Sequence, residues 1–233
     1  MQTSGTSDLA DRPISKRFIE TREFSDKDDI HEYLKYRQSI EVWPQRAADL
    51  SVVAAGEAAG VNTYIIMSPL VYGRGDGPFN QTSMQIPWIA KAALKWGYAG
   101  YIGTGTSEFD HVHILDLAAL YELLTARVLS GDDVPTGKRG IFFSATGRHT
   151  WLELAQGVGR AGVELGCLKS ETPKNVPLEQ AAQEWAMGLV DYVEVGFGSR
   201  CEPPAFTKFL RDISFPGGIT LTLDYIGRLP SLI

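Results

Sequence analysis

The segment Val61-Asn-Thr-Tyr-Ile-Ile-Met67, followed by Ser68-Pro69, decides the fold class of this chain. It is a short, almost continuous apolar run, which is typical of a parallel strand with helices on both faces. Residues 46–60 lie directly before it and carry small apolar side chains at helical spacing up to Gly60, so they predict a helix. A helix that leads into a buried strand is the second half of a β-α-β unit. The sequence therefore predicts an α/β fold.

Further helices and strands are predicted to alternate along the chain. Apolar spacing predicts helices over residues 85–96, 115–129, 150–165 and 178–187, and strands over 98–102 and 140–144. Thr150, with Glu153 three residues later, forms a capping-box pattern. Residues 5–32 predict a long loop with one helical turn, and residues 100–105 predict a hairpin turn because no helix start follows their glycines. Only residues 64–67 look like a buried strand in the first hundred, so we expect the chain to begin inside a fold.

Composition excludes several classes of protein. The chain has 233 residues, a net charge of -6 and 44% apolar residues, which excludes a disordered chain. It has no cluster of lysines and arginines, so we expect no nucleic-acid partner. No apolar run approaches the roughly 18 residues of a membrane span, and the two cysteines, Cys167 and Cys201, are too few for a disulfide scaffold or a zinc site. We expect a cytoplasmic protein with no membrane partner.

Four segments, taken in order, resemble one known family. They are Thr3-Ser-Gly-Thr6, Pro69-Leu-Val-Tyr-Gly73, the run from Asp110 to Ala118, and Gly140–Ser144 together with Thr150–Ala155. Each is short, but their order over residues 3–166 is similar to the C-terminal part of the short-chain dehydrogenase/reductase superfamily. The similarity is to its extended branch of NAD-dependent epimerases and dehydratases.

This resemblance implies a fold and a division into domains. It implies a partial Rossmann-like parallel sheet with helices, plus a smaller C-terminal substrate-binding α/β subdomain. Residues 1–75 would be the C-terminal part of the dinucleotide-binding domain, residues 76–199 the substrate-binding subdomain interleaved with late Rossmann elements, and residues 200–233 a divergent tail. The family's glycine-rich turn, which receives the pyrophosphate at a helix N-terminus, has no counterpart at the start of this chain. The expected cofactor is NAD or NADP in a full-length form, with binding by this chain alone in doubt.

The resemblance also implies site residues. Ser4 matches the catalytic hydroxyl, and His113 and Asn80 are expected to contact substrate. Five residues are expected near the cofactor: Thr3, Pro69, Leu70, Val71 and Tyr72. The family's general acid/base Tyr and its Lys, four residues later, fall on Trp43 and Ala47, and neither of these can exchange a proton usefully.

Some residues have competing interpretations. Tyr33 and Arg37 have the spacing of a displaced acid/base pair, but an irregular polar insert is favoured. Arg46 and Asp49 could contact a ribose, but a solvated helix start with charge pairing is favoured.

Two further features bear on ligands, the histidines through their residue type and Phe109 through the resemblance. His111 and His113 alternate in a predicted strand, and structural histidines are favoured over a metal site, so no metal is expected. Phe109 stands where related nucleotide-sugar enzymes carry an Arg that grips diphosphate, which favours a smaller or less charged substrate.

The hypothesis that follows is an NAD(P)-dependent oxidoreductase, similar to epimerases and dehydratases, with degenerate residues at Trp43 and Ala47. Its substrate would be a small alcohol, carbonyl or sugar-like molecule, and a homodimer is a further expectation. Two alternatives stay open. One is a non-catalytic protein of the same fold that senses a dinucleotide or metabolite, and the other is an inactive truncated product.

Overall fold

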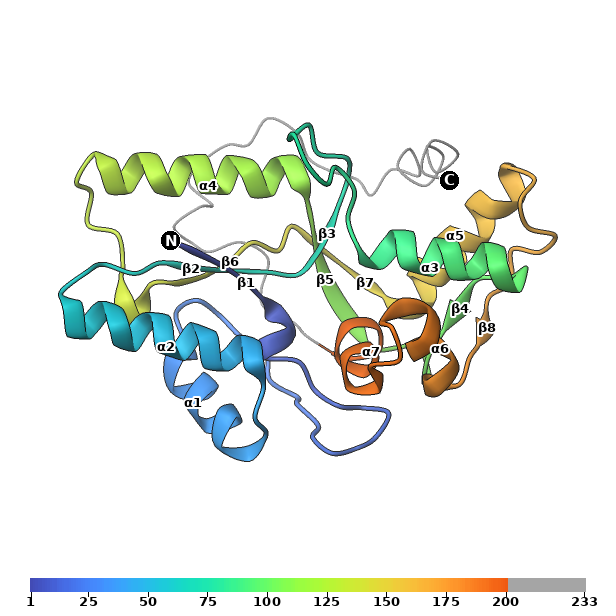
Figure 1. Cartoon of the computed structure of the whole chain (residues 1–233), viewed down its shortest axis with the longest axis horizontal. Helices are drawn as coiled ribbons and strands as arrows, with labels where there is room; N and C mark the ends of the chain where they lie inside the picture. The colour runs from blue at the N-terminus through green and yellow to red at the C-terminus, as the bar shows by residue number, and fades with distance from the viewer. Residues whose placement is uncertain (201–233) are drawn as a thin grey trace.

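The computed structural model describes residues 1–200 (Figure 1), so all but the first residue of the predicted tail lies outside the described residues. Its centre is a parallel sheet of three strands in the order β1 (Gln2–Gly5), β2 (Ile65–Ser68) and β6 (Ile141–Phe143). Within residues 1–200, β1 pairs with β2 alone. The central strand β2 is the apolar run that predicted the fold class, and all four of its residues are buried.

Helices cover both faces of this sheet (Figure 1). Helix α4 (Ile114–Leu129) lies on one face, where Leu117, Leu120 and Leu124 pack with Ile66 and Phe142. Helix α2 (Pro44–Ala59) lies on the other face, on the side of Ile65, Met67 and Phe143. Successive strand residues point to opposite faces, so the near-continuous apolar run of β2 supplies both clusters. The predicted parallel strand with helices on both faces is confirmed.

Helix α2 has clear start and stop signals. Pro44 occupies its first turn, where a missing N–H costs nothing. Gly60 ends it with a φ of 64°, a left-handed conformation that glycine adopts without strain. The predicted helix over residues 46–60 is therefore confirmed, with a start two residues earlier.

Helix α1 (Ile30–Ile40) packs beside α2, on the far side from the sheet (Figure 1). Asp29 caps its N-terminus by accepting a hydrogen bond from the Glu32 N–H. The interpretation of this region as an irregular polar insert is wrong. The helix buries only a narrow stripe that includes Tyr33, Leu34 and Arg37, and that stripe is too polar to show an apolar period.

A second sheet extends from the end of the first. Strand β3 (Leu70–Tyr72) is parallel to β5 (Glu108–His113), and β5 is antiparallel to β7 (Gly147–Thr150). Strand β3 starts two residues after β2 ends, with Pro69 between them. The chain therefore crosses directly from the central sheet to the second one.

The remaining elements form a smaller lobe around α3 (Gln85–Trp96) and α5 (Trp151–Glu164) (Figure 1). Its other elements are β4 (Gly100–Tyr101), β8 (Lys174–Asn175), α6 (Leu178–Trp185) and α7 (Val190–Phe197). Two short 3-10 turns, η1 (Thr6–Asp8) and η2 (Gly137–Arg139), complete the described elements. One hydrophobic cluster runs from the α2 side of the central sheet into this lobe, where it includes Trp185 and Phe197.

The lobe confirms some predictions and corrects one. Helix α3 has the predicted bounds, and Thr150 and Glu153 form the capping box at the start of α5. The predicted hairpin turn at residues 100–105 is wrong, because β4 pairs in parallel with β8 and not with the following strand β5. Gly103 and Gly105 have φ values of 60° and 70°, so the segment between these strands of different sheets passes through left-handed conformations that glycine adopts without strain.

Candidate functional site

The polar site lies at the carboxyl end of β1, where ligands of open parallel sheets usually bind. Ser4, the third residue of β1, donates a hydrogen bond from Oγ to Oδ2 of Asp49 at 2.5 Å. The Gln45 side-chain amide donates from Nε2 to Ser4 Oγ at 3.2 Å. Gln2 donates from Nε2 to the other Asp49 oxygen at 2.5 Å. Ser4 is 8% exposed, whereas Asp49 is fully buried.

Gln45 and Asp49 stand four residues apart on α2, so they lie one turn apart on one face of the helix. This is the spacing of the family's Tyr and Lys, and both side chains hydrogen-bond to Ser4. Trp43 instead packs its ring against Tyr192, with ring centres 5.6 Å apart, and the Arg12 guanidinium lies over it. The assignment of Trp43 and Ala47 to the Tyr and Lys positions stays a prediction, while the residues that flank Ser4 are Gln45 and Asp49.

A second carboxyl group lies beside Asp49. Asp8, in the 3-10 turn after β1, is fully buried, and neither of its oxygens has a hydrogen-bond donor within residues 1–200. Burial, and then the neighbouring Asp49, raise the pKa of Asp8 to about 9. Burial also raises the pKa of Asp49, against the hydrogen bonds that Ser4 and Gln2 donate to it. Sequence reasoning missed Asp8, because nothing in the linear pattern places it next to α2.

Arg46 of α2 is a positively charged side chain close to Asp8, but it donates its hydrogen bonds to backbone carbonyls. Its Nε and Nη2 donate to the Asp8 carbonyl at 3.0 and 2.8 Å, and its Nη1 donates to the Glu41 carbonyl at 2.9 Å. The side chain is 1% exposed, and burial lowers the pKa of Arg46 to about 10. The expected solvated helix start is therefore wrong for both Arg46 and Asp49, because both are buried and they form no ion pair with each other.

The other expected cofactor residues lie around the central sheet and the start of β3. The Thr3 hydroxyl hydrogen-bonds to the Tyr121 hydroxyl of α4, on the face of the sheet opposite Asp49. Three residues in and next to β3, Pro69, Leu70 and Tyr72, are buried, and Val71 is half-buried.

The two expected substrate residues are in different settings. His113 accepts a hydrogen bond at Nδ1 from the Leu115 N–H and so caps α4. Its ring lies edge-on to Tyr72 with ring centres 5.1 Å apart, so the structure brings these two predicted residues together. Asn80 is exposed and hydrogen-bonds within its own turn, to Thr82.

His111 pairs with His149 across the second sheet. Their Nδ1 atoms are 3.0 Å apart, and both rings are buried. Burial lowers the pKa of His111 to about 4, and burial together with His111 lowers the pKa of His149 to about 3. Within residues 1–200 no group of three His, Cys, Asp or Glu side chains is arranged to hold a metal.

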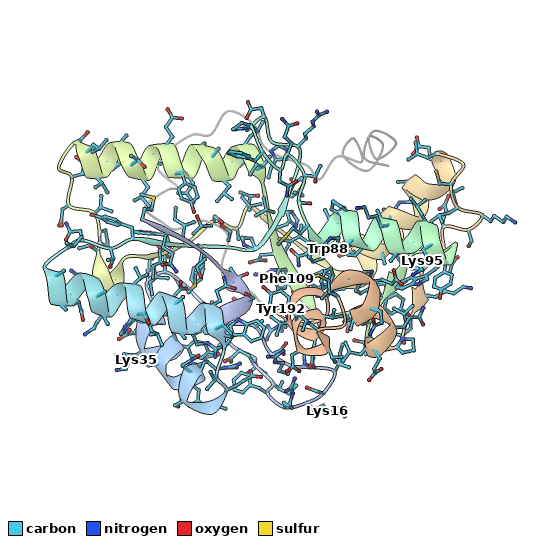
Figure 2. All side chains as sticks on the ribbon, viewed as in Figure 1. Lys16, Lys35, Trp88, Lys95, Phe109 and Tyr192 are labelled. Carbon is cyan, nitrogen blue, oxygen red and sulfur yellow. The ribbon has the colours of Figure 1, made fainter. Side chains whose placement is uncertain are left out.

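Phe109, which matches the position of the diphosphate-binding Arg in related nucleotide-sugar enzymes, is a buried core residue and does not line a site. It is 3% exposed and packs on Trp151 with ring centres 5.1 Å apart, and Figure 2 shows it inside the molecule, away from Lys16 and Lys35 at the periphery. An arginine does reach this strand from its neighbour, because Arg148 of β7 donates from Nε to Asp110 at 2.8 Å. The residue type at position 109 therefore carries no information about a diphosphate.

The displaced acid/base pair at Tyr33 and Arg37 is not supported by its surroundings. The Tyr33 hydroxyl donates to Glu20 Oε2 at 2.5 Å. Burial, and then this bond, raise the pKa of Tyr33, so its phenol exchanges a proton less readily than usual. The Arg37 guanidinium lies 3.4 Å above the centre of the Phe18 ring. Both side chains are therefore held by the segment before α1.

The described residues fit part of a nicotinamide dinucleotide. Ser68 is the last residue of β2 and Ser144 directly follows β6, so both lie at the same edge of the central sheet, and their hydroxyls are buried without a hydrogen-bond partner within residues 1–200. Such hydroxyls suit the ribose and carboxamide at the nicotinamide end. None of the strand-to-helix turns in the described part carries the glycine-rich sequence that cradles a pyrophosphate. The fit is therefore to the nicotinamide end alone.

Comparison with known proteins identifies related chains. The profile of the NAD dependent epimerase/dehydratase family matches residues 23–135. Oxidase ucsJ from an Acremonium species is 25% identical over 191 residues, which are 77% of this chain and 54% of the oxidase. An uncharacterized protein of Saccharomyces cerevisiae is 35% identical over 105 residues, 44% of this chain and 33% of that protein. The chain thus spans about half or less of the length of these curated relatives.

Solved structures share the fold. The dTDP-glucose 4,6-dehydratase DesIV from Streptomyces venezuelae, with NAD and TYD bound, matches with a TM-score of 0.56 and 16% identity over 97% of this chain and 57% of that one. The dTDP-glucose 4,6-dehydratase from Bacillus anthracis, in complex with NAD, matches with a TM-score of 0.58 and 13% identity over 99% of this chain and 61% of that one. At these identities the likeness shows a Rossmann-like fold. The profile match over residues 23–135 and the shared fold make this chain similar to the NAD-dependent epimerase/dehydratase family over part of its length.

Proposed function

We propose that this chain carries the catalytic hydroxyl of an NAD(P)-dependent oxidoreductase that acts on a small alcohol, carbonyl or sugar-like substrate. One observation carries the proposal: Ser4 Oγ is held by Gln45 and Asp49 at the carboxyl end of a parallel strand. A hydroxyl fixed there can hydrogen-bond to the reacting oxygen of a substrate. The sugar-nucleotide dehydratases that share the fold support a small polar substrate.

The other residues have proposed roles around this hydroxyl. Thr3 and the run from Pro69 to Tyr72 would hold the nicotinamide end of NAD or NADP, whose chemistry when bound is to accept or deliver a hydride. His113 and Asn80 would contact the substrate. In this proposal residues 1–75 complete the dinucleotide-binding domain and residues 76–199 bind substrate. A cytoplasmic location and a homodimer are part of the same proposal, the first supported by the presence of only two cysteines.

A second candidate function is a non-catalytic sensor of a dinucleotide or metabolite. It is favoured by the absence of any Tyr or Lys hydrogen-bonded to Ser4 in residues 1–200, where Gln45 and Asp49 stand instead. An amide does not titrate, and a carboxyl group does not supply the fixed positive charge of a Lys. In this function Ser4 would contact a ligand but would take no part in turnover.

Ligand binding and turnover separate the two functions. We would titrate NADH and NADPH into this chain, and into a form extended to the length of its relatives, and follow nicotinamide fluorescence. Reduction of a panel of small aldehydes, ketones and keto-sugars would be followed by loss of that fluorescence. If the oxidoreductase proposal holds, the extended form turns over and Ser4→Ala lowers kcat by about 10²-fold, the effect of removing one hydrogen bond to a developing oxyanion.

Ser51→Ala is the matched control, because Ser51 lies on the exposed side of α2 and donates only to the Ala47 carbonyl. It should leave kcat unchanged. Dinucleotide binding without turnover would support the sensor instead. No binding of either dinucleotide by the extended form would refute both functions.

A further inference from the structure

The carboxyl groups of Asp8 and Asp49 lie within hydrogen-bonding reach of each other, in a place that water does not reach. Each is 0% exposed. Asp49 receives one hydrogen bond from Gln2 and one from Ser4, so both of its oxygens have donors. Asp8 receives none that the described residues supply. Two ionised carboxylates offer only acceptors to each other, so the pair as two anions would leave the Asp8 oxygens without a donor.

The nearby positive charge does not remove this problem. Arg46 donates hydrogen bonds from Nε and Nη2 to the Asp8 backbone carbonyl and from Nη1 to the Glu41 backbone carbonyl. Within residues 1–200 no Lys, Arg or His forms an ion pair with either carboxyl. A buried carboxylate without an ion-pair partner is strongly disfavoured, and two adjacent carboxyl groups commonly retain one proton between them. A single proton on the pair would give the Asp8 oxygens their missing hydrogen bond.

We propose that Asp8 and Asp49 share one proton, and that Ser4 connects this pair to the reacting oxygen of the substrate. The connection to substrate rests on the proposed oxidoreductase function, while the shared proton does not. Ser4 is 8% exposed, whereas both carboxyl groups are fully buried, and it lies next to the last residue of β1 while donating to Asp49. Ser4 is therefore the catalytic residue, and Asp8 and Asp49 are positioning residues that act through it.

The proton transfer balances in the direction of alcohol oxidation. The substrate O–H proton would pass to Ser4 Oγ while the Ser4 proton passes to Asp49 Oδ2. An oxidised nicotinamide dinucleotide, when bound, would supply the acceptor for the hydride from the substrate carbon. The carboxyl pair then holds two protons and no net charge. The reverse transfers supply the proton for carbonyl reduction. In this proposal the Asp8–Asp49 pair takes the general acid/base role that a Tyr has in the family. Ser4 is the only one of the three residues that must contact the substrate.

The shared proton can be measured without cofactor or substrate. We would record infrared spectra of the purified chain and follow the carbonyl stretch of protonated carboxylic acids from pH 5 to 10. The difference between wild type and Asp8→Asn should contain an acid band at pH 7 that disappears with a midpoint near 9, the pKa of Asp8. In Asp49→Asn the midpoint of Asp8 should fall by at least one pH unit, a tenfold loss of proton affinity, because its charged neighbour is gone. Asp133→Asn, at an exposed position, should leave the band unchanged.

A second measurement uses the unsubstituted protein and so does not depend on the variants folding. With ¹³C-labelled aspartate, the Cγ resonances of Asp8 and Asp49 should both move through the same titration steps, since an interacting pair titrates as a unit. The proposal is overturned if no acid band is present at pH 7, if the midpoint of Asp8 is the same in Asp49→Asn as in wild type, or if the two resonances titrate independently. A shared proton in a protein that binds no dinucleotide would leave this part standing and refute the function alone.

Discussion

Asp8 should make the free energy of unfolding of this chain decrease as pH rises. Its pKa is raised from 3.8 in the unfolded chain to about 9 in the fold. A carboxyl with a raised pKa binds its proton more tightly in the folded state. Its contribution to stability is therefore fully present below pH 3.8 and is lost as pH rises toward 9. Between these limits one proton difference changes the free energy of unfolding by about 1.4 kcal/mol per pH unit.

Substitution of Asp8 by Asn removes this dependence, because the amide carries no ionisable proton. From pH 5 to pH 7 the wild type should lose about 2.7 kcal/mol relative to Asp8→Asn. In urea unfolding this corresponds to a relative shift of about 1 M in the midpoint. The measurement is urea denaturation of both proteins at pH 5, 6, 7 and 8, with Asp133→Asn as the control at an exposed position. Midpoints that change in parallel in wild type and Asp8→Asn would show that Asp8 is ionised in the fold, and the reasoning would be refuted.

Three further predictions concern other polar side chains of the fold. Arg46→Met should lower the free energy of unfolding by about 2–3 kcal/mol in urea, because it leaves buried backbone carbonyls without donors. Thr150→Ala should lower it by about 1 kcal/mol in thermal denaturation, since the cap of α5 is lost. His111 and His149 should show no titration between pH 5 and 8 by NMR, because burial lowers their pKa values to about 4 and 3. The unfolded chain takes up these protons below about pH 6.5 and the fold does not, so this pair should cost stability as pH falls from 6.5 to 4.

The parts of the fold that were predictable have their cause in local sequence. Helix α3 and the capping box of α5 depend on contacts within a few residues, so spacing alone places them. Strand β2 is apolar on both faces because both faces are covered. Strand β7 was not predicted because its burial alternates weakly, and only His149 of its residues is buried. Its pairing with β5 depends on a contact that lies far apart in sequence.

The candidate site was predicted only in part, and the reason is geometric. Ser4 was identified by resemblance to a family motif, and the structure surrounds it with polar partners. Counting residues from Pro69 placed the functional pair on Trp43 and Ala47, whereas the face of α2 that meets β1 carries Gln45 and Asp49. A shift of two residues rotates a side chain by more than half a turn around a helix. Only the packing of α2 against the sheet fixes which face meets Ser4.

The hydrogen bonds of Arg46 indicate that the Asp8–Asp49 pair has a role in proton transfer and not in the stability of the fold. A buried Arg next to two buried carboxyls could form an ion pair, and this would lower their pKa values and keep them charged. Instead its guanidinium donates to the backbone carbonyls of Asp8 and Glu41. It therefore fixes the position of the 3-10 turn that carries Asp8 while leaving the carboxyl proton in place. Perturbed titratable groups that keep an exchangeable proton are concentrated at functional sites. This pair is joined through Ser4 to the edge of the sheet where ligands of the fold bind, so the arrangement favours proton transfer over scaffolding.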